Sequence, residues 1–184
     1  MAFSLDHDQK FAKVKLSRRI PGIYTEVHNV MSGAPIPRAV ELVTTLLIPK
    51  KSKNTEQLKK GIVNTDGVVS GSRLHGRVRR ASIKGEPSKR ALYSTTAEVN
   101  ILTDDGAEVL MIDRGEWRGS KDAFARFMAN QLVAPSELYM VGVVRFQTSD
   151  PQYTWLKEGE FLSHAVGEGD RIKISVYRTR AARE

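Results

Sequence analysis

The chain contains no cysteine among its 184 residues. Disulfide bonds, thiolate zinc sites and cysteine nucleophiles are therefore excluded, and such a composition suits a reducing compartment. Apolar residues nowhere run for the roughly 18 positions that a membrane-spanning helix needs. The first residues also lack the basic segment and the following apolar segment of a secretory signal. We therefore expect a cytoplasmic protein without a membrane partner.

Short motifs that identify cofactor-dependent enzymes are also absent. The sequence has no phosphate-cradling glycine loop, no dinucleotide-binding glycine pattern and no Gly-x-Ser-x-Gly elbow. Asp104, Asp105 and Glu108 crowd one segment but do not follow the spacing of a calcium loop. His75 and His164 form no metal-binding or catalytic pattern with each other or with a carboxylate. We therefore predict no cofactor and no metal, which leaves acid and base side chains as the available chemistry.

Positive charge is concentrated in one segment. The net charge is +8, yet residues 50–90 hold 12 Lys/Arg against 3 Asp/Glu, and the rest of the chain holds 17 against 18. Such asymmetry can indicate an anionic partner such as nucleic acid. It is also typical of a solvated edge strand, where charge prevents sheet-to-sheet aggregation. Both interpretations remain open at this point.

The length of the chain predicts a single folded unit. Residues 1–20 are polar and basic, and Ile20-Pro21-Gly22 then interrupts the sequence. We predict a basic N-terminal extension over residues 1–20 and one β-barrel domain over residues 21–184.

Several segments have the composition of β-strands. Residues 39–48 are rich in β-branched side chains and precede Pro49. Glycines interrupt the apolar pieces of residues 68–78, which predicts one kinked strand. Two further strand-like runs within residues 94–113 flank Thr103-Asp104-Asp105-Gly106, and Asp-Gly favours the tight turn of a hairpin.

One helix and two late strands follow. Residues 120–132 repeat apolar side chains at three- and four-residue spacing after Ser120, a suitable N-cap, and Pro135 comes next. Residues 138–146 and 171–177 have strand composition. Many strands, one short helix and frequent glycine turns predict a mainly β fold, either a single antiparallel barrel with lipocalin-like or calycin-like closure or a sandwich. The barrel is favoured because closure removes exposed strand edges.

Three sequence blocks resemble motifs of a known family. They are Thr103-Asp104-Asp105-Gly106-Ala107 with Arg114-Gly115; Phe146-Gln147-Thr148 followed by Asp150-Pro151 and Tyr153-Thr154-Trp155-Leu156; and Val176-Tyr177-Arg178. Residues 71–78 form a weaker fourth block. Residues 39–178 are thus similar to an uncharacterised family of small bacterial β-barrel proteins, the domain of unknown function 3237. The resemblance implies a small barrel that often self-associates, so a homo-oligomer is expected, and it implies no reaction.

The chain departs from the family pattern at three places. Residues 79–86 replace a Gly-Gly-x-Asp-Trp stretch, Thr96 stands at an acidic position, and Lys157 replaces an asparagine. If those acidic and amide groups form the family's pocket, the pocket of this member is altered.

The first strand of the predicted hairpin offers a candidate base. Thr96, Glu98 and Asn100 share one face of that strand, and apolar side chains at 97, 99 and 101 share the other. A polar barrel interior would desolvate Glu98 and raise its pKa toward that of a general base near neutral pH. An apolar interior with a solvated polar exterior is the alternative. The sequence does not decide between these two arrangements.

Two aromatic residues offer a candidate binding site. On a strand, Tyr153 and Trp155 would share a face and could stack on a flat ligand, with Arg145 as an anchor for an anion. Alternatively, both rings fill one end of the barrel. Lys157 would lie on the same face, as an acid, an electrostatic clamp or an exposed lysine.

These observations predict a small-molecule-binding barrel, with a cofactor-independent lyase or isomerase as the leading function. Its substrate would be an aromatic or carboxylate-bearing metabolite. Its candidate catalytic residues are Glu98 as base and His75 or Tyr153 as acid. The substrate-binding candidates are Arg145, Trp155, Arg114, Asn100 and Lys157. The alternatives are a non-catalytic nucleic-acid-binding module using residues 50–90, which is less favoured, and a non-catalytic ligand carrier.

Overall fold

The computed structural model describes residues 40–47, 54–64 and 66–178. The predicted N-terminal extension, residues 1–20, and the start of the predicted domain lie outside the described residues.

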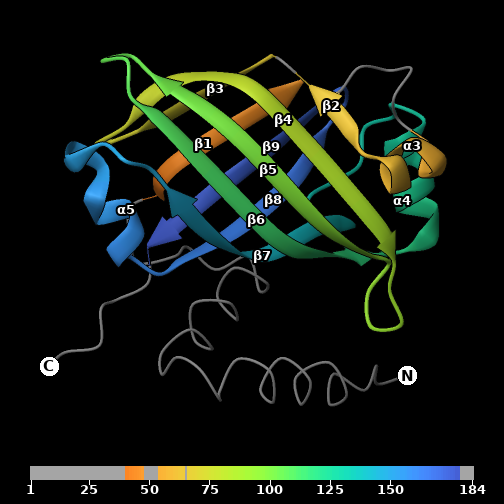
Figure 1. Cartoon of the computed structure of the whole chain (residues 1–184). Coiled ribbons are helices and arrows are strands. Elements are labelled where there is room, and N and C mark those ends of the chain that lie inside the picture. Colours follow the sequence, from red (N-terminus) through yellow and green to blue (C-terminus); the bar gives the residue numbers. More distant parts are fainter. Residues whose placement is uncertain (1–39, 48–53, 65, 179–184) are drawn as a thin grey trace, which may run out of the picture.

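Eight antiparallel strands form a closed barrel (Figure 1). Their order around the barrel is β3, β1, β9, β8, β7, β6, β5 and β4, and β4 pairs with β3 to close the ring. A short additional strand, β2 (Ile62–Asn64), pairs with residues 81–83 of β4. The eight barrel strands are β1 (Val40–Leu47), β3 (Gly67–Gly71), β4 (His75–Pro87), β5 (Tyr93–Thr103), β6 (Glu108–Gly119), β7 (Leu138–Gln147), β8 (Phe161–Glu168) and β9 (Arg171–Arg178). The predicted antiparallel barrel is confirmed.

Short helices lie at the two ends of the barrel (Figure 1). At one end are α3 (Thr55–Lys60) and α4 (Lys121–Met128). At the other end a 3-10 turn, η2 (Pro151–Tyr153), leads into α5 (Thr154–Glu158). Within the part of the chain that the structure describes, no helix is long and apolar enough to cross a membrane.

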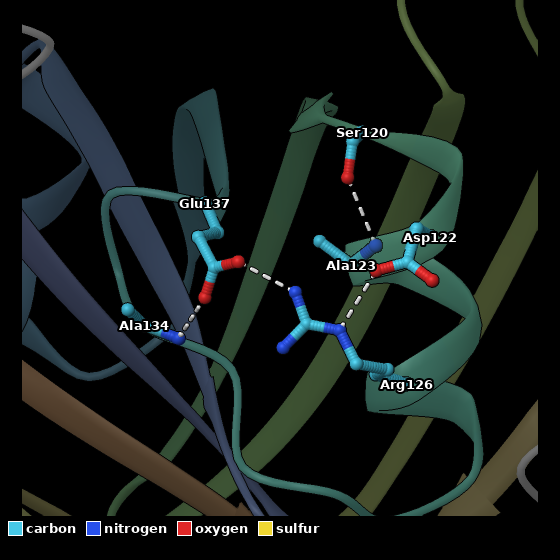
Figure 2. A network of polar contacts seen from close by, with 6 residues as sticks. All are labelled: Ser120, Asp122, Ala123, Arg126, Ala134 and Glu137. Atoms are coloured by element: carbon cyan, nitrogen blue, oxygen red, sulfur yellow. Dashed lines mark hydrogen bonds and ion pairs between the residues drawn. The ribbon is translucent and has the colours of Figure 1, made fainter.

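The start of α4 was predicted correctly and its end was not. Ser120 caps the helix, because its Oγ accepts a hydrogen bond from the Ala123 amide at 2.9 Å (Figure 2). The helix ends at Met128, before the predicted Leu132. Asn130 has a left-handed backbone with φ of 61°, a conformation that commonly terminates helices.

A network of ion pairs holds α4 against the loop that follows it (Figure 2). Arg126 Nε lies 3.0 Å from Asp122 Oδ2, and Arg126 Nη2 lies 2.5 Å from Glu137 Oε1. Glu137 Oε2 also accepts a hydrogen bond from the Ala134 amide at 3.2 Å. Exposed pairs of this kind contribute little stability individually. Together they fix the path from α4 to β7.

One strand prediction was wrong. Residues 68–78 form two strands joined by a turn, β3 and the beginning of β4, in place of one kinked strand. The glycine signal in this segment has a different origin. A Cβ at Gly76 would lie 2.4 Å from the carbonyl oxygen of Leu102, so glycine allows β4 to approach β5 closely.

A second prediction was wrong at the C-terminal aromatic pair. Tyr153 and Trp155 do not share a strand face, because they lie in η2 and α5. The helical turn begins at Asp150, whose Oδ1 accepts a hydrogen bond from the Gln152 amide at 2.9 Å. Pro151 follows at the first position of the turn, where its fixed φ is compatible with helical structure.

Alternating side chains fill the barrel with an apolar core. On β5 the side chains at 95, 97, 99, 101 and 103 are buried, whereas Glu98 and Asn100 are exposed. The interior is therefore the apolar face of this strand, and its polar face is outside. The largest fully buried side chains come from strands all around the barrel and from its ends, including Leu46, Leu74, Ile101, Met111 and Phe161.

Candidate functional site

A carboxyl group lies inside the barrel, in the middle of β6. Every second residue of β6 faces inward, and Asp113 occupies one of these positions between Met111 and Gly115. Asp113 is 1% exposed. Charged residues are rarely buried to this degree without a charged partner, so Asp113 needs an explanation beyond packing.

Ser163 is the hydrogen-bond partner of this carboxyl group. Its Oγ donates to Asp113 Oδ1 at 2.8 Å, and Ser163 is itself 2% exposed. The second oxygen, Asp113 Oδ2, is buried and has no hydrogen-bond partner among the described residues. One carboxylate oxygen is therefore held in place, and the other keeps its lone pairs free within the barrel.

Glycine in the intervening strand makes room for this pair. Strand β7 lies between β6 and β8, and Gly142 is opposite Ser163 in the register. A Cβ at Gly142 would lie 2.5 Å from Asp113 Oδ1 and 2.7 Å from Ser163 Oγ. Any larger residue would push the two polar side chains apart. The Asp113–Ser163 pair thus depends on three adjacent strands.

Burial changes the acidity of the group. Desolvation raises the pKa of Asp113 from its ordinary 3.8 to about 7, and the hydrogen bond from Ser163 partly opposes that rise. A carboxyl group with this pKa exchanges its proton near neutral pH, which is the property required of a general acid or base. Perturbed acidity inside a barrel identifies Asp113 as the candidate centre.

The surroundings of Asp113 are closed by side chains. Phe161, 1% exposed, packs edge-on against Phe146 with ring centroids 5.1 Å apart. At the α4 end a small cavity of about 20 Å³ remains, lined by apolar side chains such as Trp117 and Phe127. That volume accommodates about one water molecule, so it does not hold a metabolite.

Two of the family-like sequence blocks meet at the α5 end. The Tyr153 hydroxyl donates to both carboxylate oxygens of Asp105, each at 3.0 Å, and the Thr103 hydroxyl donates to Asp105 Oδ1. The hydrogen bond from Thr103 is the largest cause that lowers the pKa of Asp105. Burial, and then the bond to Asp105, raises the pKa of Tyr153. Tyr153 therefore keeps its proton and joins η2 to the β5–β6 turn.

Trp155 lies beside this joint and is flanked by two arginines. The Arg73 guanidinium carbon lies 4.1 Å from the centroid of the Trp155 ring, and that of Arg178 lies 6.0 Å from it. The Trp155 ring also contacts Phe161 edge-on, with centroids 6.2 Å apart. Trp155 thus connects two exposed or half-buried cations to the buried aromatic side chains.

Four of the predicted site residues lie together on the outside of the barrel. Glu98 and Asn100 of β5 point outward, as do Arg114 of β6 and Arg145 of β7. The register places Glu98 across from Ile112, and Ile112 across from Arg145. Because Glu98 is exposed, the desolvation that its proposed role as a base requires is not provided at this position.

The remaining predicted residues are dispersed. His75 begins β4 and is exposed, and Lys157 is an exposed residue in the last turn of α5. Tyr153 and Trp155 are at the barrel end, as in the alternative interpretation of the aromatic pair. His164 faces outward on β8, where burial lowers its pKa and its ring lies 5.9 Å from that of Tyr139.

Sequence reasoning missed Asp113 and Ser163. The alternation of β6 contained a weak signal. Its inward-facing residues include the apolar Val109, Met111 and Trp117, and Asp113 is the one acidic residue in that series. The signal was hidden because Leu110 and Ile112 put apolar side chains on the outward face of β6 beside Asp113 as well.

Comparison with known proteins identifies relatives of this chain. Residues 39–179 match the model of a family described as "Protein of unknown function (DUF3237)". A UPF0311 protein of Rhodopseudomonas palustris (strain TIE-1) is 32% identical over 87 residues, which cover 47% of this chain and 57% of that relative. A UPF0311 protein of Bradyrhizobium diazoefficiens shows the same identity over the same length. The matched segment thus spans little more than half the length of these relatives.

Solved structures are similar in fold. A conserved protein of unknown function from Rhodopseudomonas palustris has a TM-score of 0.65 at 22% identity, covering 77% of this chain and 95% of that protein. A β-barrel-like protein from Acinetobacter baumannii AYE has a TM-score of 0.57 at 21% identity, with coverages of 76% and 92%. At these identities the likeness concerns the barrel alone.

Proposed function

The chain belongs to the DUF3237 family, and from that premise we propose that this member is a cofactor-independent enzyme that binds a small organic molecule and moves a proton with Asp113. The observation that carries the proposal is the carboxyl group inside the barrel, whose pKa is about 7 and whose Oδ2 has no partner among the described residues. A buried polar atom without a partner costs stability, which a function would explain.

The two oxygens of Asp113 have separate roles in this proposal. Ser163 holds Oδ1 and thereby orients the carboxylate, while Oδ2 accepts a proton from an acidic C–H or O–H of the substrate. Return of that proton to a different substrate atom completes an isomerisation. Departure of a leaving group from the neighbouring carbon, with the proton then released to solvent, completes an elimination. Both reactions belong to the lyase and isomerase classes expected from the sequence.

Asp113 takes the role of base that the sequence pattern suggested for Glu98. Glu98 is exposed on the outer face of β5, where water stabilises its charge. Tyr153 is also less suited to act as the acid, because its hydroxyl already donates to Asp105. In this proposal Asp113 alone alternates between base and acid.

Substrate reaches Asp113 by movement at the α5 end. Phe161 is two residues from Ser163 on the same inward face of β8, and its ring contacts Trp155. Displacement of Phe161 and α5 would open a path to Oδ2. Loops and short helices of this kind commonly control access to enzyme sites.

Proton exchange in D₂O tests the proposal even where the product of the reaction is not identified. A panel of small ketones, lactones and carboxylic acids is first screened by thermal shift, and the compounds that stabilise the protein are incubated with it in D₂O. NMR then measures deuterium incorporation. We expect Asp113→Asn to lower the exchange rate at least about 100-fold, the usual contribution of a general base.

Glu98→Gln is the matched control, since it removes a carboxylate from the outer surface, and it should exchange at the wild-type rate. Equal exchange by wild type and Asp113→Asn would contradict the proposal. Stabilisation by a compound without any exchange would favour the ligand-carrier alternative.

The basic outer face of β4 supports a second candidate, binding of nucleic acid. Arg77, Arg80 and Lys84 are exposed there, whereas Arg79 pairs with Glu108 at 2.6 Å. Trp155, whose ring could stack on a base, lies at the barrel end and not on that face. We expect weak oligonucleotide binding at low salt that disappears near physiological salt. Tight binding that Arg77→Gln with Arg80→Gln abolishes would favour this candidate over the enzyme.

A further inference from the structure

Two cations converge on one indole ring at the α5 end of the barrel. Arg73 comes from the turn between β3 and β4, Arg178 ends β9, and Trp155 lies in α5. Their guanidinium carbons are 4.1 and 6.0 Å from the ring centroid, so their separation cannot exceed the sum of these distances. Three segments far apart in the sequence thus place two positive charges beside the same ring.

Within the described part of the chain, neither arginine has its charge balanced by a neighbour. Across residues 40–47, 54–64 and 66–178, no carboxylate forms an ion pair with Arg73 or Arg178. Four other arginines do have such partners: Arg79, Arg118, Arg126 and Arg171. An anion bound beside Trp155 would meet guanidinium groups that form no ion pair with the described carboxylates, so binding would break none of those ion pairs.

The guanidinium groups are adjacent to the aromatic residues that cover the barrel interior. Trp155 contacts Phe161, and Phe161 precedes Ser163 on the inward face of β8. Glycine permits this packing, because a Cβ at Gly159 would lie 2.5 Å from the Phe161 ring and 3.3 Å from Arg178 Nε. A molecule held by the arginines would therefore have its carbon skeleton against apolar rings, on the path toward Asp113.

We propose that Arg73 and Arg178 form the carboxylate subsite of the barrel, with Trp155 as the wall that positions Arg73. The ligand class is a small organic carboxylate, because guanidinium groups match the geometry of a carboxylate and the rings behind them favour a carbon skeleton. Inorganic phosphate can also pair with guanidinium groups, but it has no carbon skeleton to pack against the rings. The inference deepens the proposed function, since the carboxylate would fix the substrate while Asp113 acts on it.

Binding of benzoate tests the subsite, with benzamide as its neutral analogue and inorganic phosphate as the competing anion. Isothermal titration calorimetry on the full chain measures each Kd. We expect saturable binding of benzoate, with benzamide and phosphate at least about 10-fold weaker. Arg73→Gln and Arg178→Gln should each weaken benzoate binding about 10- to 100-fold, the range for a lost charge-assisted hydrogen bond.

Arg171→Gln is the matched control, because it removes the same charge from the exposed start of β9, at the opposite end of that strand from Arg178. Its Kd for benzoate should equal that of wild type. The location is checked in Trp117→Phe, in which Trp155 is the remaining tryptophan of the chain. Titration with benzoate should then change the Trp155 fluorescence, and the Kd fitted to that change should equal the Kd from calorimetry.

Three results would overturn the inference: no saturable benzoate binding, an unchanged Kd in both arginine variants, or phosphate binding as tight as benzoate. The two proposals fail separately. Asp113→Asn should retain benzoate binding while losing proton exchange. Normal exchange by Asp113→Asn, with benzoate binding lost in the arginine variants, would refute the acid–base role and leave the carboxylate subsite standing.

Discussion

At the scale of single residues, the buried carboxyl group of Asp113 should govern the pH dependence of stability. Its pKa is about 7 in the folded protein and near 3.8 in an unfolded chain. Below about pH 4 both states are protonated; between pH 4 and 7 the unfolded chain loses the proton while the folded chain keeps it. Stability therefore falls as pH rises through this window, by roughly 4 kcal/mol if no other group compensates.

Asp113→Asn removes the titrating carboxyl group, so the variant should not lose stability as the pH rises from 4 to 7. An asparagine keeps the acceptor for Ser163, but its NH2 group takes the buried place of Oδ2, which has no hydrogen-bond partner among the described residues. We expect the Tm of the variant to exceed that of wild type by several degrees at pH 8 and to be equal or lower at pH 4.5. Thermal unfolding across this range is the measurement. A constant difference in Tm between Asp113→Asn and wild type at every pH would show that Asp113 does not titrate in this window.

The identity of the site residues depended on information that the sequence did not contain. The alternation of residues 96–101 was recognised, but which face turned inward was not decided, because both arrangements agree with a period of two. For Asp113 the difficulty was greater, since apolar residues occupy both faces of β6. Ser163 approaches Asp113 only because Gly142 lies between them in the register. Such a contact across three strands has no local pattern.

At the scale of elements, the hydrogen bond between Tyr153 and Asp105 should be structural. It joins η2 to the β5–β6 turn, and Tyr153 is 4% exposed. Tyr153→Phe keeps the ring in the core and removes the hydroxyl. We expect a Tm lower by about 2–4 °C, as for the loss of one hydrogen bond in a protein of this size. Proton exchange should keep the wild-type rate, whereas lost exchange at an unchanged Tm would restore Tyr153 as the catalytic acid.

Local signals predicted elements well where local forces determine them. The Asp-Gly turn of the β5–β6 hairpin and the Ser120 cap of α4 were both found, because each depends on a few adjacent residues. Residues 153–156 were misassigned, since aromatic residues two apart fit either a strand or a helical turn. Strand β8 was not predicted, because Ser163, His164 and Gly167 interrupt its apolar pattern and pairing with β7 and β9 overrides this.

At the scale of the whole molecule, closure depends on pairings between distant segments. Strand β1 pairs with β9 near the other end of the described chain, whereas β4 pairs with its sequence neighbours β3 and β5. The sequence indicated a barrel because so many strands would otherwise leave exposed edges. It could not supply the strand number, because the ring closes through the long-range pairing of β1 with β9. Self-association stays a prediction, as does the N-terminal extension.

A closed barrel should unfold as one unit, and the two tryptophans can test this. Trp117 packs on Phe127 of α4, and Trp155 packs on Phe161 beside α5, at opposite ends of the barrel (Figure 1). In urea, Trp117→Phe and Trp155→Phe leave one fluorescent reporter at each end, and far-UV circular dichroism reports the strands. Within each variant we expect the fluorescence and circular dichroism midpoints to coincide, as in two-state unfolding.

If the chain self-associates, both midpoints should rise together with protein concentration, because assembly stabilises the folded state by mass action. An earlier fluorescence transition in the Trp117→Phe variant alone would mean that the α5 end opens independently of the barrel. Such local opening is the movement that access to Asp113 requires.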